Sequence, residues 1–218
     1  MRKSLSLAAV AAASSALLLV PATSAFAAGH VLTIGKTGGT AVKVGAVLKA
    51  GLAKGKTATF SLGSEKLTCK VATFAAKVTT NPAKPGTAKE SLTSQTFSKC
   101  ATNVTGITVK SIKANNLPYK VSVSDASGGP VTITGTSSSE PVKLTVKAAA
   151  GTTTVTCAYT AKTVKGNASN TGNTITFSKQ KFTKASGSAL CPASANFAAV
   201  FGPVKDTSVT GSPKVFVN

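Results

Sequence analysis

Four cysteines are the residues of this chain whose type and spacing suggest chemistry most directly: Cys69, Cys100, Cys157 and Cys191. Zinc sites need closely spaced cysteine or histidine ligands, but these four lie far apart and His30 is the only histidine. A nucleophilic cysteine needs a base, and His30 lies near the start of the expected mature chain, where segments are usually loose. We therefore predict two structural disulfides, for which four cysteines allow three pairings.

Other groups that could support catalysis are sparse. The acidic residues are Glu65, Glu90, Asp125, Glu140 and Asp206. We interpret them as isolated, solvated surface positions rather than as paired carboxylates for glycoside hydrolysis. No G-x-S-x-G motif occurs, and no histidine is placed to activate a serine. The sequence predicts no catalytic, metal-binding or cofactor-binding residue, and a protein that is not an enzyme.

Residues 1–27 have the pattern of a secretory signal peptide. Two basic residues precede an apolar stretch from Leu5 to Val20, which is too short to cross a bilayer comfortably, and Ala25-Phe26-Ala27 forms a cleavage site. We expect cleavage after this site to leave one secreted domain at 28–218. Because a twin arginine is missing, the general secretory (Sec) route is favoured. No second long apolar run follows, so no transmembrane segment is expected in the mature chain.

Alternating apolar and polar residues recur along the mature chain. In the segment 66–71, for example, Leu67, Cys69 and Val71 are expected to point inward. Threonine and valine favour strands, and Gly, Pro and Asn mark the turns between them. Only the segment 47–54 suggests a short turn of helix. We predict an all-β, β-sandwich-like fold of many short antiparallel strands with two disulfides.

Two segments, 58–100 and 143–191, look like copies of one unit. Each contains a hairpin whose second strand ends in Leu-Thr-Cys or Val-Thr-Cys, then a strand carrying Gln and Phe, then a closing cysteine. The order and spacing of the cysteines favour an internal duplication, and coincidence in a chain rich in Thr, Ser and Lys is the alternative. The repeat favours the pairs Cys69–Cys100 and Cys157–Cys191, one in each unit.

The chain is strongly basic, with 25 Lys and Arg against 5 Asp and Glu and a net charge of +20. Removing Arg2 and Lys3 with the leader leaves 23 lysines, no arginine and a net charge near +18. Arginine can bond two oxygens of a phosphate or base at once, whereas lysine offers a point charge. We therefore expect non-specific attraction to anionic cell-wall polymers and no specific recognition of nucleic acid.

Several segments resemble those of small secreted actinomycete proteins that are often labelled only by their export signal. These segments are Glu90–Cys100, Asn115–Tyr119, Thr154–Tyr159 and Ile175–Lys184. The resemblance covers most of the mature chain and implies an exported β-rich protein with paired cysteines. It supplies no catalytic or binding residue.

The expected function is that of a non-enzymatic secreted protein, structural or interaction-type, loosely associated with the anionic cell envelope. The alternative is an extracellular carrier that holds a small apolar ligand between its sheets. That alternative follows by analogy with secreted sandwiches of the neocarzinostatin type, which share its size class, export and two disulfides. An unrecognised hydrolase is a third hypothesis, although no residue pattern favours it.

Overall fold

The computed structural model describes residues 29–218, and the predicted signal peptide lies outside the described residues. The described part is built of strands, turns and loops, with no helix among them. Neighbouring strands pair in antiparallel fashion. The all-β prediction is confirmed.

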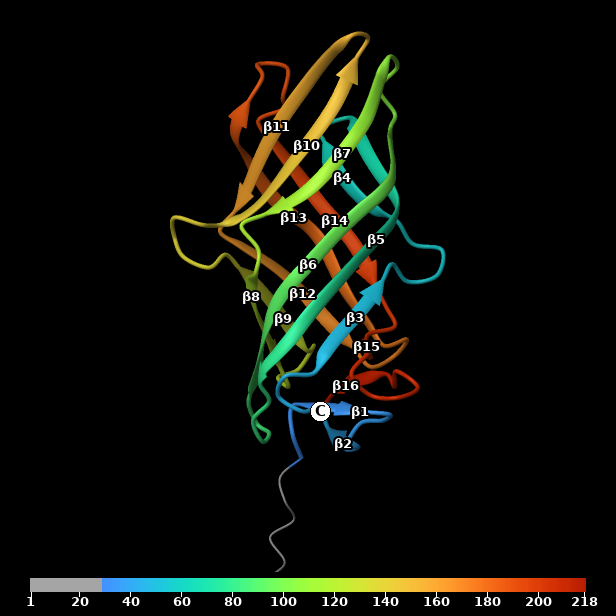
Figure 1. The fold of residues 1–218 in the computed structure, drawn as a ribbon, viewed down its shortest axis with the longest axis vertical. Coiled ribbons are helices and arrows are strands. Elements are labelled where there is room, and N and C mark those ends of the chain that lie inside the picture. The colour runs from blue at the N-terminus through green and yellow to red at the C-terminus, as the bar shows by residue number, and fades with distance from the viewer. Residues whose placement is uncertain (1–28) are drawn as a thin grey trace, which may run out of the picture.

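Three long strands and the shorter β14 form the frame of the molecule: β5 (Glu65–Thr80), β6 (Thr87–Thr102), β13 (Thr174–Gly187) and β14 (Ser194–Phe201). Two sets of shorter strands connect β6 to β13 at different heights (Figure 1). In the upper half the set is β7 (Ile107–Asn115), β10 (Val142–Ala150) and β11 (Thr153–Ala161). In the lower half it is β8 (Tyr119–Ser124), β9 (Pro130–Thr134) and β12 (Thr163–Ser169).

The remaining strands complete the circle and cover its lower end. In the upper half β4 (Ala58–Leu62) joins β14 to β5, and in the lower half β3 (Val47–Gly51) lies between β5 and β15 (Lys205–Asp206). A separate small sheet of β1 (Leu32–Ile34), β2 (Thr40–Ala41) and β16 (Val215–Val217) lies at the lower end (Figure 1). The buried side chains of this small sheet belong to the same apolar core as the large one.

The large sheet closes into an eight-strand barrel, so the predicted sandwich is wrong. From β6 the hydrogen-bonded order runs through β8, β9, β12, β13, β14, β4 and β5, and the long β5–β6 pairing returns it to β6. The pairing of β11 with β13 closes the upper half in the same way. A barrel and a sandwich share the same alternating strands, and they differ only in whether the outermost strands pair.

A cluster of phenylalanines fills the middle of the barrel. Phe197 lies at its centre, with its ring 5.0 Å from that of Phe60 and 6.4 Å from that of Phe182. Below them, Phe201 contacts Phe177 and Phe74 through edge-on rings. Aromatic rings bury a large apolar area each, so this cluster divides the barrel interior into an upper and a lower part.

The inward face of β5 and β6 shifts by one residue next to the first disulfide. Cys69 is fully buried, but two residues later Val71 is 37% exposed and Ala72 is buried instead. On the partner strand Lys99 has a positive φ of 52°, which breaks the regular alternation there. The prediction that Val71 points inward is therefore wrong. The segment 47–54 also differs from its prediction, because its residues 47–51 form strand β3 rather than a turn of helix.

Both disulfides have the pairing that the repeat favours: Cys69–Cys100 and Cys157–Cys191. Cys69 and Cys100 lie directly opposite each other on β5 and β6. Cys157, on β11, binds Cys191 in the β13–β14 connection. The bridges span 31 and 34 residues. Closing a loop of this length lowers the conformational entropy of the unfolded chain, which raises the free energy of unfolding by about 3–4 kcal/mol for each bridge.

Candidate functional site

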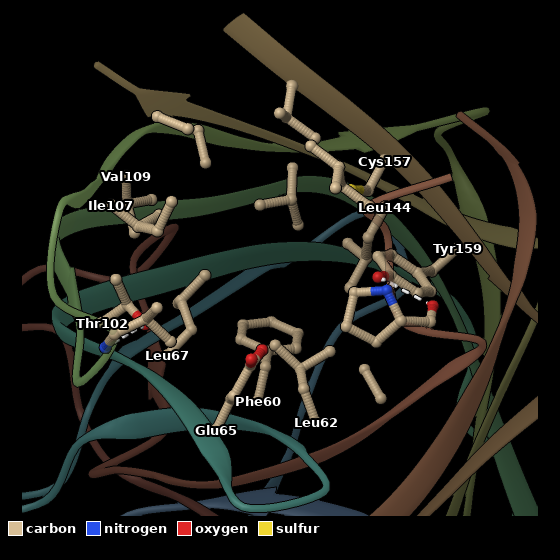
Figure 2. A pocket seen from close by; sticks show the side chains of 18 of the residues that line it. Phe60, Leu62, Glu65, Leu67, Thr102, Ile107, Val109, Leu144, Cys157 and Tyr159 are labelled. Carbon is tan, nitrogen blue, oxygen red and sulfur yellow. Dashed lines mark hydrogen bonds between the residues drawn. The ribbon is translucent and has the colours of Figure 1, made fainter. Parts of the chain in front are cut away.

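The upper half of the barrel contains an apolar cavity of about 270 Å³ (Figure 2). Apart from Glu65, Thr102 and Tyr159, its lining consists of apolar side chains and the cystine of Cys157. The apolar lining residues come from β4, β5, β7, β10, β11, β13 and β14 and from two connections: Phe60, Leu62, Leu67, Val104, Ile107, Val109, Leu144, Val146, Ala148, Ala149, Ala150, Val155, Phe182, Leu190, Pro192 and Ala195. A cavity of this kind, with few polar groups, is typical of sites that bind small molecules.

The phenylalanine cluster forms the floor of the cavity. Phe60 and Phe182 line the cavity and are buried, and both rings contact Phe197 beneath them. Small side chains above this floor, such as the run Ala148–Ala150 on β10, leave the space unfilled. The register between β7 and β10 shifts at Lys147–Ala148, so this part of the wall departs from regular pairing.

The cavity opens at the upper end of the barrel, between four strand connections. Leu62 and Glu65 flank the β4–β5 turn, Val104 lies in the β6–β7 turn, and Ala150 precedes the β10–β11 turn. The apolar side chains near this opening are only half-buried, and Leu190 in the β13–β14 connection is 72% exposed. Apolar side chains exposed around an apolar cavity indicate a surface that gains from being covered.

The β13–β14 connection is held firmly at the edge of the opening. Its Cys191 is bound to Cys157, and the hydroxyl of Tyr159 donates a hydrogen bond of 3.2 Å to the carbonyl of Pro192. The ammonium of Lys184 donates to the carbonyl of Cys191 at 3.2 Å. Because these contacts fix the loop before any ligand arrives, binding would cost little ordering of this edge.

Three polar side chains reach the cavity. Thr102 accepts a hydrogen bond of 3.2 Å from the backbone N–H of Val104. Tyr159 is 4% exposed, and burial together with the negative charge of Glu65 raises the pKa of its phenol. Figure 2 shows Glu65 extending from the start of β5 toward the cavity beside Phe60.

Of the five acidic residues, Glu65 and Glu140 are exposed as expected, but two others are not solvated. Glu90 and Asp206 are buried, at 9% and 1% exposed. Glu65 is exposed at the cavity opening, and Asp125 accepts a hydrogen bond from the backbone N–H of Gly86. No two of them share a site, and residues 29–218 contain no cluster of three or more groups that could hold a metal ion.

Of the predicted cysteine positions, only Cys157 lines the cavity; Cys191 holds its edge, and Cys69–Cys100 lies outside the lining. Sequence reasoning missed the cavity because its lining comes from residues spread between Phe60 and Ala195. One signal was present, since the small-residue run Ala148–Ala150 follows a strand pattern where larger side chains would normally fill a core.

No family model, curated protein or solved structure matches this chain. In the part of the chain that the structure describes, no helix is long and apolar enough to cross a membrane.

Proposed function

We propose that this protein is a non-enzymatic extracellular carrier that holds a small apolar molecule in the upper cavity. The observation that supports the proposal is an apolar space of about 270 Å³ that opens between four strand connections. A gap left by imperfect packing would be enclosed by the core, but this space is bordered by half-buried side chains and by the exposed Leu190. Its location inside a barrel mouth is common for small-molecule sites.

The volume limits the size of the ligand. An apolar cavity of about 150 Å³ holds benzene, so a cavity of about 270 Å³ has room for roughly ten non-hydrogen atoms. A chain of eight carbons or a small ring system therefore fits within the walls. A larger ligand would extend past Leu190 into solvent.

Octan-1-ol is a suitable probe, because the cavity walls carry methyl groups that report on an occupant. We expect saturable changes in the methyl NMR signals of Ile107, Val109 and Val155, which line the cavity. The methyl signals of Val121 and Val131, in the lower half of the barrel, should not change.

A pair of variants on one strand provides the control. Val155→Phe adds a ring on the cavity side of β11, whereas Thr154→Phe adds the same ring at the exposed neighbouring position. We expect Val155→Phe to weaken octanol binding about tenfold or more, and Thr154→Phe to leave it unchanged. Equal binding by both variants, or methyl changes that never saturate, would rule out the cavity as the binding site.

A further inference from the structure

Glu65 is the one charged side chain among the described residues that line the cavity. The strand alternation places Glu65 and Leu67 toward the cavity and Lys66 between them on the other face. Lys147 lies likewise between Val146 and Ala148 on β10 and is not part of the lining. Although the chain is rich in lysine, no lysine among the described residues lines the cavity. The charged group at its opening is therefore the negative carboxylate of Glu65.

Of the three polar side chains that reach the cavity, Glu65 and Tyr159 offer a ligand hydrogen-bond acceptors, whereas the hydroxyl of Thr102 can both donate and accept. The carboxylate of Glu65 offers two oxygens and no hydrogen. The hydroxyl hydrogen of Tyr159 is donated to the carbonyl of Pro192, at 3.2 Å, which leaves only the lone pairs of that oxygen. Glu65 and Tyr159 line the same cavity, and the negative charge of Glu65 adds to the effect of burial in raising the pKa of Tyr159.

We propose that the ligand of this cavity is an amphiphilic amine, with a short hydrocarbon body in the cavity and its ammonium group bound to Glu65. This inference rests on the proposed carrier function. An ammonium group carries three donors and no acceptor, so it complements the carboxylate and the phenol oxygen. Hydrogen bonds between charged partners are roughly twice as strong as those between neutral ones.

An amphiphilic carboxylate is the main competitor, because the outer lysines attract anions toward the whole surface. Attraction of this long-range kind mainly raises the rate of encounter. The contact at the head group decides which molecule stays, and there an anion would face the carboxylate of Glu65. The structure therefore favours the amine.

Three probes with the same eight-carbon chain separate these cases: octylamine, octan-1-ol and octanoate. Binding is measured by calorimetry at pH 7 and low salt and is located by the methyl signals named above. We expect octylamine to bind about tenfold tighter than octan-1-ol, and octanoate to bind most weakly.

Variants of Glu65 test the role of its charge. Glu65→Gln should weaken octylamine binding to the level of octan-1-ol and leave octan-1-ol binding unchanged. Glu140→Gln is the matched control, because it removes the same charge from an exposed residue outside the cavity lining. Glu65→Lys should reverse the preference in favour of octanoate. Glu65 is exposed, and thermal unfolding of each variant verifies that the fold is intact.

The outcomes distinguish the two proposals. If none of the three probes changes the cavity methyl signals, the carrier function itself is wrong. If octan-1-ol binds as tightly as octylamine and Glu65→Gln changes neither affinity, the carrier function stands and the amine assignment is overturned. Octanoate binding most tightly to the unaltered protein would also overturn the amine assignment.

Discussion

Replacing Glu90 with glutamine should change how the stability of this protein depends on pH. Glu90 lies on the inward face of β6 between the buried Ala88 and Leu92. It borders two small cavities of about 40 and 30 Å³ in the lower half of the barrel, and no other charged residue lines either of them. Burial raises the pKa of its carboxyl group from 4.5 to about 7.

The sign of the effect follows from the direction of this shift. A carboxyl group whose pKa is raised on folding binds its proton more tightly in the folded state. Its favourable contribution is therefore complete below about pH 4.5 and is lost as the pH rises through about 7. Each pKa unit corresponds to about 1.4 kcal/mol, so the loss from pH 4.5 to pH 8 is about 3 kcal/mol.

Glu90→Gln keeps the shape of the protonated carboxyl group but cannot ionise. The variant should be about as stable as the unaltered protein at pH 4.5 and about 3 kcal/mol more stable at pH 8.

Urea unfolding at pH 4.5, 6, 7 and 8, with both disulfides intact, measures this difference directly. Glu140→Gln is the control, since Glu140 is exposed and its carboxylate accepts a hydrogen bond from Thr136. The comparison between variants cancels the pH dependence of all other groups. A difference between Glu90→Gln and the unaltered protein that stays constant from pH 4.5 to 8 would refute the reasoning.

Three further predictions concern packing, disulfides and charge. Gly166→Ala should lower the free energy of unfolding, measured in urea, by about 1–3 kcal/mol, because the added Cβ would lie 2.8 Å from the Phe177 ring. Gly51→Ala is the control and should be tolerated, because its Cβ would meet only a carbonyl oxygen at 3.8 Å. Replacing either cysteine pair with serine should lower the free energy of unfolding by about 3–4 kcal/mol. Only the loss of Cys157–Cys191 should also weaken octan-1-ol binding, because that bridge holds the β13–β14 connection at the cavity. Equal effects of the two replacements on binding would contradict this. The lysine-rich protein should be retained to a similar extent on immobilised teichoic acid, heparin and DNA, and its retention should fall steeply from low to physiological salt. Tight binding to any one of these polymers at high salt would contradict the prediction that the lysine surface binds anions non-specifically.

Some features of the fold could be predicted because they depend on neighbouring residues. Alternation in the segment 66–71 indicated a strand, and the structure places this segment within β5. The disulfide pairs followed from the order of similar segments along the chain. The signal peptide at 1–27, the duplication and the cell-envelope association stay predictions.

Other features could not be predicted because alternation contains no information about distant partners. The helical turn expected at 47–54 was wrong, because Val47–Gly51 pairs with β5 and that pairing decides its conformation. The inward direction of Val71 was wrong because the irregularity at Lys99, on the neighbouring strand, shifts the face of both strands. Glu90 was expected at the surface, but a charged residue type does not reveal which face of β6 is enclosed.

Residue types and local periodicity by themselves determined the strand-rich class, and the order of similar segments favoured the cysteine pairing. Only the tertiary structure decided that the sheet closes, since closure depends on hydrogen bonds between β5 and β6 and between β11 and β13. Closure in turn created the cavity and brought Glu65 to its opening, in the same lining as Tyr159. A cavity is space that side chains from distant segments leave unfilled, and such space exists only once those segments have packed around it.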